Sequence, residues 1–402
     1  MDVKGAYLNG DLKEEIYMNQ PEGFSDGTSR LCRLIKTIYG LKQSGREWNH
    51  KLDSQLSKIG FKRLHSDPCV YIRNSNGIEI ITVWVDDLLL FTKSKEQMNN
   101  LKGELSNLFE ITDLGEPNKL IGIEITRDRD NGTLTIKQTK YIEAILEKEK
   151  MENANAVSTP LDPNVKLEPQ EPQDATTINS NYALLTGSLM YAAIGTRPDI
   201  AYAVNKLCSF NNNPGMIHWS AAKRVLRYLK GSKDIGITYR KGTQNKNRVY
   251  GYADASFASN TDKMSTSGHA FFLNGGAITW GSKKQKVLAL STAEAEYSAM
   301  AEAARRLTWL RNLYYEIGYK QNEPTVLYAD NQSAIAIATN LQYHQRSMHF
   351  PICQHYIRQK IRDRDARLEY CRTDKMTADI FTKALPRPKH TQHAQTLSLS
   401  AA

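Results

Sequence analysis

Cysteine is scarce in this sequence, and its spacing excludes two structural classes. The chain of 402 residues contains five cysteines, an odd number, and no two of them form a C-x-x-C pair. A disulfide framework and a zinc site built from cysteine both require paired or closely spaced thiols. The cysteine content therefore indicates a reducing compartment.

Long apolar runs and an excess of acidic residues are also missing. No run reaches the roughly 18 apolar residues of a membrane span, and the opening M-D-V-K-G lacks the apolar segment of a signal peptide. We therefore expect an intracellular protein, cytoplasmic or nuclear, with no membrane span. The net charge of +10 and the pI near 9.1 favour a polyanionic partner, either nucleic acid or an anionic membrane surface.

The sequence has no internal repeat and no low-complexity tract, so changes of pattern divide it into four regions. Residues 1–150 mix short β-like runs with helical ones, and 151–246 begin with a proline-rich linker or extended loop at about 153–180 and continue into a helical connection. Residues 247–390 follow the order of an α+β domain with a mixed sheet. Residues 391–402 are expected to be a frayed tail.

Hydrophobic periodicity predicts the elements that carry the interesting side chains. The expected elements are a hairpin at 81–91, a helix at 94–109, strands at 119–126, 133–137, 249–256, 287–290 and 324–330, a hairpin at 270–280, and helices at 218–230, 291–317 and 377–385. The helix at 218–230 carries four basic residues beside an apolar stripe. Its basic face is either directed at nucleic acid or simply solvated.

Two adjacent carboxylates, Asp86 and Asp87, interrupt the apolar run V-W-V-D-D-L-L-L-F at 83–91. Aspartate is a common turn residue, so an ordinary hairpin turn accounts for one of them. Two like charges side by side are unfavourable unless a cation neutralises them. A plain turn and a metal site therefore both remain open.

Acidic residues of the C-terminal third stand at informative positions. Asp254 and Asp330 each end an apolar β-run, where open sheets tend to place ligands. Glu296 lies four residues before Met300 on the inward stripe of its helix, whereas Glu294 fits a capping box with the preceding serine. An inward glutamate needs a partner, and the alternative is a first helical turn from which the side chain reaches solvent.

Asp379 begins the short helix T-A-D-I-F-T-K-A-L, where an acid is favoured by the helix dipole alone. Together with Asp254, Glu296 and Asp330 it allows another interpretation. Carboxylate oxygens are the usual protein ligands of magnesium. Two magnesium ions about 3.5–4 Å apart promote cleavage of phosphodiesters, and the four acids are candidates to hold such a pair.

Nine stretches in order resemble the reverse transcriptase–ribonuclease H part of the copia-type LTR retrotransposon Pol polyproteins, from residue 1 to about 390. They are D-V-K-G-A-Y-L-N-G-D-L-K-E-E-I-Y-M-N-Q-P-E-G-F from Asp2, Y-G-L-K-Q-S-G-R-E-W from Tyr39, W-V-D-D from Trp84, D-L-G-E-P-N-K-L-I-G-I-E-I from Asp113, R-P-D-I-A-Y from Arg197, Y-A-D-A-S from Tyr252, L-S-T-A-E-A-E-Y from Leu290, Y-A-D-N-Q-S from Tyr328, and A-D-I-F-T-K-A-L from Ala378.

The resemblance implies a multidomain α+β fold with a reverse transcriptase palm and thumb, a connection segment and a ribonuclease H-like mixed-sheet domain. It implies that Asp2, Asp86 and Asp87 hold two Mg²⁺ for RNA-directed DNA synthesis from dNTPs on an RNA template with a DNA primer. Tyr7 matches the steric gate and Gln43 a glutamine near the incoming nucleotide. Four further acids match the ribonuclease H metal ligands, which would cut the RNA of an RNA–DNA hybrid: Asp254, Glu296, Asp330 and Asp379.

Several positions depart from the family pattern. The fingers that precede the first catalytic aspartate are not in the 402 residues, so a polymerase impaired by truncation is expected. Trp84 and Gly45 replace a usual tyrosine and proline, and Met348 and Pro351 fall where lysine and aspartate are expected. Two hypotheses follow: an enzyme with both activities, or a catalytically dead remnant that only binds nucleic acid. The sequence does not predict an oligomeric state.

Overall fold

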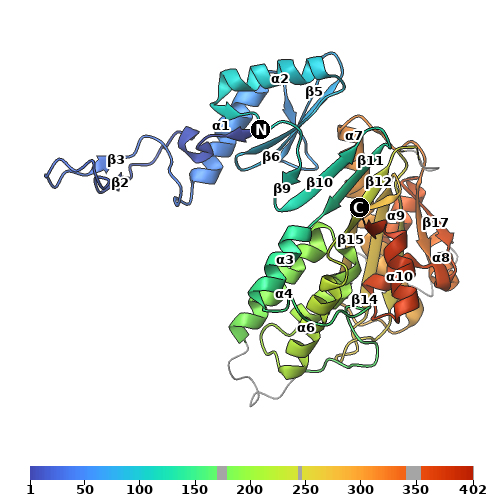
Figure 1. The fold of residues 1–402 in the computed structure, drawn as a ribbon. Coiled ribbons are helices and arrows are strands. Elements are labelled where there is room, and N and C mark those ends of the chain that lie inside the picture. Colours follow the sequence, from blue (N-terminus) through green and yellow to red (C-terminus); the bar gives the residue numbers. More distant parts are fainter. Residues whose placement is uncertain (170–178, 243–246, 341–354, 402) are drawn as a thin grey trace. The chain divides into compact units, whose positions relative to one another are not determined.

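The computed structural model describes residues 1–169, 179–242, 247–340 and 355–401. These form two compact units, Met1–Pro117 with Asn312–Lys320, and Asn118–Arg311 with Gln321–Ala402 (Figure 1). The strands expected at 119–126 and 133–137 in the first region therefore lie in the second unit. Within the described ranges, no helix combines the length and the apolar composition that a membrane span requires.

The first unit is built on a six-stranded sheet with the order β4-β5-β6-β7-β1-β8. Its elements are β1 (Asp2–Val3), η1 (Ala6–Asn9), β2 (Tyr17–Met18), β3 (Cys32–Arg33), α1 (Ser44–Lys58), β4 (Lys62–Arg63), β5 (Val70–Asn74), β6 (Ile78–Trp84), β7 (Asp87–Phe91), α2 (Lys95–Leu108) and β8 (Ile111–Thr112). The expected hairpin is confirmed, because β6 and β7 pair antiparallel down to Trp84 and Asp87.

Helix α2 forms where the periodicity predicted it. The Ser94 hydroxyl accepts a hydrogen bond from the Gln97 N–H and so caps the first turn. Leu101 and Leu105 lie four residues apart on one face and are fully buried with Trp48 and the other core residues of this unit. The prediction of a helix at 94–109 is confirmed.

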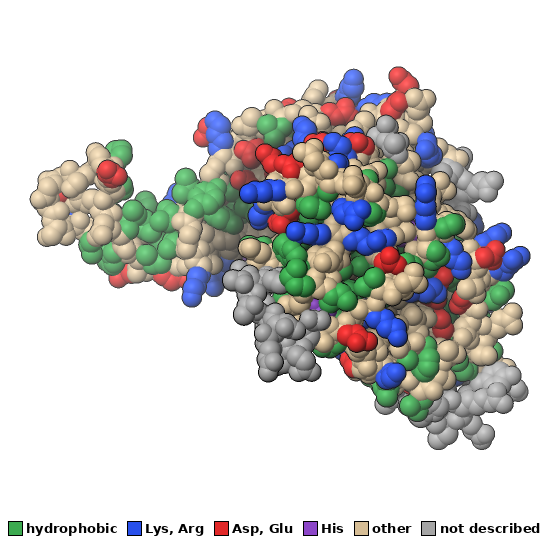
Figure 2. All heavy atoms as spheres, turned by 60° about the horizontal axis from the view of Figure 1, so that its bottom comes forward, with side chains coloured by type: hydrophobic (Ala, Val, Ile, Leu, Met, Phe, Trp, Pro, Cys, Tyr) green, Lys and Arg blue, Asp and Glu red, His purple; other side chains and the backbone are tan. Residues whose placement is uncertain are grey.

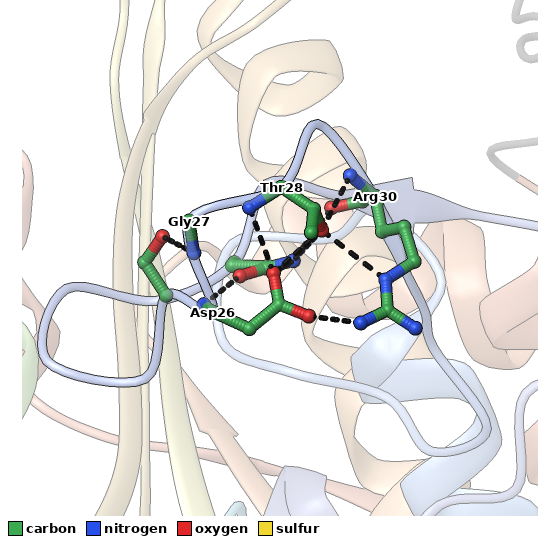
Figure 3. Close-up of polar contacts among 6 residues, drawn as sticks. Asp26, Gly27, Thr28 and Arg30 are labelled. Carbon is green, nitrogen blue, oxygen red and sulfur yellow. Dashed lines mark hydrogen bonds and ion pairs between the residues drawn. The ribbon is translucent and has the colours of Figure 1, made fainter.

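Between β1 and α1 the chain forms an arm that includes the short β2–β3 pair. Its tip is held by polar contacts, in which Asp26 accepts hydrogen bonds from the Thr28 N–H and Oγ1 and pairs with Arg30 (Figure 3). The Thr28 hydroxyl and the other donors lower the pKa of Asp26 to about 2. Phe24 and Ile35 are 83% and 78% exposed, so this arm is shaped by local hydrogen bonds rather than by apolar burial.

The second unit contains two five-stranded sheets. Its first part comprises β9 (Lys119–Leu120), β10 (Ile123–Asp128), β11 (Thr133–Lys137), α3 (Thr139–Lys148), α4 (Asn179–Gly195), η3 (Pro198–Ile200), α5 (Ala201–Cys208), α6 (Met216–Lys230) and β12 (Ile235–Arg240). The strand expected at 119–126 is instead a hairpin. Ile121 and Gly122 both adopt positive φ, as a tight two-residue turn requires.

The rest of the second unit forms the predicted mixed sheet, with the order β15-β14-β13-β16-β17. The elements of this part of the chain are β13 (Tyr250–Ser256), β14 (Thr266–Leu273), β15 (Gly276–Lys284), α7 (Thr292–Glu316), β16 (Thr325–Ala329), α8 (Gln332–Thr339), α9 (Tyr356–Arg362), β17 (Ala366–Tyr370), η6 (Thr373–Lys375), η7 (Thr377–Phe381), α10 (Arg387–Thr396) and β18 (Leu399–Ala401). The end of α7, from Asn312, belongs to the first unit. The first three strands pair antiparallel, whereas β13, β16 and β17 pair in parallel. The expected α+β class is confirmed.

The frayed tail expected at 391–402 is a wrong prediction for the part that the structure describes. Strand β18 pairs with β12 and completes the sheet β18-β12-β11-β10-β9. Leu397 and Leu399 are buried, because the few apolar residues of this polar segment reach a partner strand distant in sequence. They belong to one core that extends from Ile142 to Leu399 and unites the connection helices with the mixed sheet.

The strand expected at 287–290 is also a wrong prediction. Val287 and Leu288 are 45% and 48% exposed and follow the end of β15 without strand pairing. Ala289 instead packs into a small cluster of alanines with Ala295 at the start of α7. A four-residue apolar run is too short for periodicity to separate these two outcomes.

The basic residues of α6 are bound within the protein. Arg227 and Lys230 donate hydrogen bonds to the backbone carbonyls of Asn155 and Ala154, in the proline-rich loop. Arg224 bonds to the hydroxyl of Thr159 in the same loop. Three of the four basic side chains therefore fix a loop, which neither of the two interpretations of this helix anticipated. The surface in Figure 2 nevertheless shows many Lys and Arg side chains interspersed with acids.

Candidate functional site

Three acids of the second unit form a cluster at one end of the mixed sheet. Asp254 lies on β13, Asp330 directly follows β16, and Glu296 lies in the first turns of α7. Strands β13 and β16 are parallel neighbours, so their carboxyl ends meet at the same edge. One carboxylate oxygen from each of the three residues lies within 4.8 Å of the others, and no other such group occurs in the described ranges.

Two of the three acids in the cluster are buried, and each lies close to other carboxylates. Asp254 and Glu296 are 2% and 7% exposed. Burial, and next the charge of Asp379, raise the pKa of Asp254 to about 7. Burial, and next the charge of Asp254, raise the pKa of Glu296 to about 10. The side chain of Glu296 therefore points inward, as the stripe of its helix predicted, and not into solvent.

Hydrogen bonds hold the three carboxylates in place. The Ala255 N–H donates to Glu296 Oε2 at 3.1 Å, and the Thr373 hydroxyl donates to Asp330 Oδ2 at 2.9 Å. Glu294 has the separate capping role that its spacing predicted, because its N–H donates to Ser291 Oγ and its carboxylate accepts from the Leu290 N–H. Glu294 is thus not a member of the cluster.

Asp379 lies beside the cluster but not within it. Asp379 is fully buried on η7, and its Oδ1 lies 2.7 Å from Lys383 Nζ. Element η7 is a short 3₁₀-helix, whereas a helix over 377–385 was expected. Thr382, from the same segment, donates a 2.5 Å hydrogen bond to Asp254 Oδ2. Gly268, opposite Asp254 on β14, permits this approach, since a Cβ there would lie 2.7 Å from Phe381 and Thr382.

The donor set of the cluster fits a divalent cation. Carboxylate oxygens are hard ligands of the kind that Mg²⁺ binds. Two of the three acids have raised pKa values that a cation would lower again by favouring the charged form. The sequence analysis did not identify the supporting residues Thr373, Thr382 and Lys383. The four-residue spacing of Asp379 and Lys383 could have indicated their ion pair, because residues four apart on a helix are neighbours.

The acids of the first unit meet through the backbone of its sheet. Asp2 on β1 lies opposite Asp87 on β7, and the Val3 N–H donates to the Asp86 carbonyl at 2.9 Å. Burial, followed by the charges of Asp86 and Asp2, raises the pKa of Asp87. These three carboxylates are neighbours, but they do not approach one another as closely as those of the cluster in the second unit.

The turn that presents Asp86 is held in an uncommon conformation. Val85 has φ +54°, which a β-branched residue rarely adopts. The Trp48 indole N–H donates a 2.7 Å hydrogen bond to the Val85 carbonyl, and Trp48 itself is buried on α1. Sequence reasoning gave Trp48 no role, because α1 and the turn are far apart in the chain.

Tyr7 and Gln43 both lie near the start of α1. Tyr7 is on η1, and its ring centroid is 4.7 Å from that of Tyr39. Gln43 is the N-cap residue of α1, and a Cβ on the neighbouring Gly45 would lie 3.9 Å from the Tyr7 hydroxyl. Trp84 is 57% exposed at the end of β6. The departures at Met348 and Pro351 lie outside the described residues.

Comparison with known proteins shows the family to which the chain belongs. Residues 1–163 match the family model described as reverse transcriptase (RNA-dependent DNA polymerase). The putative transposon Ty5-1 protein YCL074W of Saccharomyces cerevisiae is 35% identical to this chain. The match covers 76% of this chain and 100% of that protein. The chain belongs to the family of Pol polyproteins of copia-like retrotransposons.

Two plant relatives are similar along nearly the whole chain. The retrovirus-related Pol polyprotein from transposon TNT 1-94 of Nicotiana tabacum is 41% identical over 97% of this chain. The polyprotein from transposon RE1 of Arabidopsis thaliana is 36% identical over 96%. The chain spans 30% and 26% of the lengths of these two relatives.

Among solved structures, the RNase H1 of Halobacterium salinarum NRC-1 matches 34% of this chain and 94% of its own. The identity is 17% and the TM-score 0.24. The N-terminal RNase H domain of rv2228c from Mycobacterium tuberculosis matches 37% of this chain and 97% of its own, at 13% identity and the same TM-score.

Proposed function

We propose that the second unit is a magnesium-dependent nuclease that cuts the RNA strand of RNA–DNA hybrids. The observation that carries this proposal is the cluster of Asp254, Glu296 and Asp330, in which Asp254 and Glu296 are buried and Asp330 is half-buried. A purely structural core has no use for two buried acids beside a third, because each buried carboxylate is costly to ionise without a cation. Membership of a retroelement Pol family makes phosphodiester chemistry the activity that such a cluster fits.

The residues around the cluster prepare it for that chemistry. Thr382, the Ala255 N–H and Thr373 each fix one carboxylate, so the three oxygens are oriented before any substrate arrives. Asp254, Glu296 and Asp330 would hold the metal ions, with Asp379 beside them. Two bound Mg²⁺ supply activation of a water nucleophile and stabilisation of the leaving oxygen.

For the first unit we propose the polymerase site of a reverse transcriptase. Asp2, Asp86 and Asp87 would bind two Mg²⁺ and join a DNA primer to dNTPs on an RNA template. Tyr7 would contact the sugar of the incoming nucleotide, and Gln43 would lie near its base pair. The adjacency of Asp2 and Asp87 across β1 and β7 supports this assignment.

Cleavage of a labelled RNA–DNA hybrid by the purified 402-residue chain tests the nuclease proposal. We expect RNA cleavage that requires Mg²⁺ and is lost in Asp254→Asn, while Asp234→Asn, an exposed acid of the same unit, stays active. A DNA duplex of the same sequence serves as the substrate control. If a folded chain binds the hybrid but does not cut it, the alternative of a catalytically dead remnant that only binds nucleic acid is correct.

A further inference from the structure

The rings of Tyr7 and Tyr39 pack against each other near the start of α1, with their centroids 4.7 Å apart and their planes at 48°. Tyr39 is 53% exposed and so is not a core residue. Tyr7 is half-buried, and its ring also packs against the core of the first unit. Tyr7 therefore contacts an exposed aromatic side chain in addition to the core.

The backbone of Tyr7 is fixed by hydrogen bonds, whereas its side chain is not. The Tyr7 carbonyl accepts hydrogen bonds from the Gly10 N–H, at 3.1 Å, and from the Thr37 hydroxyl. Within the residues that the structure describes, no hydrogen bond to the Tyr7 hydroxyl occurs. The orientation of the Tyr7 ring therefore depends on packing rather than on a polar contact.

Tyr39 is presented by a turn that is held at both ends. Thr37 and Ser44, on either side of Tyr39 in the chain, are 0% and 1% exposed. The Ser44 hydroxyl donates to the Ile38 carbonyl, and Gly40 adopts φ +98°, a conformation that glycine alone adopts readily. The position of Tyr39 is therefore set by its own turn and not by its contact with Tyr7.

The hydroxyl side of the Tyr7 ring has open space toward α1. A Cβ on Gly45 would lie 3.9 Å from the Tyr7 hydroxyl and 4.0 Å from its Cε1, which is ordinary van der Waals contact. Glycine places no side chain there, although the family pattern usually has proline at this position. Outside the core, the ring contact with Tyr39 therefore restrains Tyr7.

We propose that Tyr39 is a specificity-determining residue, which positions the Tyr7 ring against the sugar of the incoming nucleotide. The inference rests on the proposed polymerase function of the first unit and concerns its choice between dNTPs and rNTPs. A side chain rejects an additional oxygen only if it cannot move aside when that oxygen arrives. Fixing the Tyr7 ring therefore converts its contact with the sugar into rejection of the 2′-hydroxyl.

Insertion of a single nucleotide by the 402-residue chain tests this proposal. A DNA primer on an RNA template is extended opposite uridine, and kcat/KM is measured for dATP and for ATP. Tyr39→Ala should lower the ratio of the two values about two- to tenfold, the range that the free energy of one aromatic pair allows. Tyr39→Phe keeps the ring and should keep the ratio.

A rescue variant and a matched control accompany these two substitutions. Gly45→Ala, added to Tyr39→Ala, places a Cβ beside the Tyr7 hydroxyl and should restore part of the ratio. Tyr17→Ala removes another tyrosine of similar exposure, 52%, from the arm and should leave the ratio unchanged. A loss of folding would lower both kcat/KM values together and would not change their ratio.

A second readout does not depend on catalysis. 3-Fluorotyrosine is incorporated in place of Tyr7, and its ¹⁹F signal is recorded in the full chain. The nearby ring at position 39 should displace this signal in the wild type and in Tyr39→Phe. In Tyr39→Ala the signal should move toward that of the free amino acid.

The outcomes keep the two proposals distinct. If Tyr39→Ala extends the primer with an unchanged ratio, the specificity role is refuted while the polymerase stands. If that variant instead binds the primer–template more weakly at an unchanged ratio, Tyr39 contacts nucleic acid and the proposal is overturned. If no chain extends a primer, the polymerase proposal fails by itself, and the ¹⁹F signal decides whether Tyr39 positions Tyr7: a shift in Tyr39→Ala supports the positioning, and an unmoved signal refutes it.

Discussion

Replacing Asp254 by asparagine should make the protein more stable when no divalent cation is present. The pKa of this carboxyl is raised from 3.8 to about 7, so the folded state holds its proton over a pH range where the unfolded state has lost it. The free energy of unfolding therefore falls as the pH rises from about 4 to 7. At pH 8 the ionised carboxylate costs on the order of 4 kcal/mol, and the amide of asparagine avoids that cost while it keeps a hydrogen bond with Thr382.

Urea unfolding followed by circular dichroism in EDTA measures this difference. The variant should gain about 2–4 kcal/mol over the wild type at pH 8 and little at pH 4. Added Mg²⁺ should stabilise the wild type, by about 2.7 kcal/mol at a hundred times its dissociation constant, and should stabilise the variant far less. Asp234→Asn is the control and should follow the wild type at every pH.

The reasoning would be refuted if Asp254→Asn were less stable than the wild type at pH 8 in EDTA. That result would mean that the carboxylate is already compensated within the chain, and that the cluster is a structural network with no need of a cation. A gain in stability with a loss of cleavage would instead identify Asp254 as a residue kept for function at the expense of stability.

Three further substitutions test the supporting structure. Arg197→Ala leaves the buried Asp199 without its partner at 2.7 Å and should lower the free energy of unfolding by about 3–5 kcal/mol in urea; a decrease below 1 kcal/mol would contradict this. Trp48→Phe removes the hydrogen bond to Val85 and should reduce primer extension by the 402-residue chain more than hybrid binding, whereas equal reductions would indicate misfolding. Gly268→Ala should lower the free energy of unfolding by about 1–3 kcal/mol and slow RNA cleavage, because the added Cβ would lie 2.7 Å from Thr382. An unchanged cleavage rate would contradict the importance of that contact.

Local sequence spacing was sufficient to predict the position of a side chain where that position depends only on the helix or strand that carries it. Glu296 points inward because it lies on the buried stripe of α7, and the spacing to Met300 encodes this directly. Asp330 directly follows β16 as expected, whereas Asp254 lies two residues before the end of β13. The mixed sheet follows from the order of the elements. These parts of the fold and site could be predicted from the sequence.

Long-range contacts could not be predicted in this way. Thr382 bonds to Asp254 across 128 positions, and no local periodicity specifies that pair. Asp379 matched a family motif, yet its ion pair with Lys383 sets it apart from the other three acids. The strand at 287–290 was predicted but does not form, and Val287 is exposed. A strand-like composition does not produce a strand where no neighbouring strand is available to pair.

The pairing of β12 with β18 has a consequence for protein synthesis. The Ser398 hydroxyl bonds to the Thr238 carbonyl, a partner made 160 residues earlier. At roughly 5–20 residues per second, a ribosome exposes one edge of β12 for on the order of 10–30 s before β18 emerges. An open strand edge invites pairing with another chain. Nascent copies on the same messenger should therefore depend on chaperones, and slower elongation over this interval should lower the yield of folded protein.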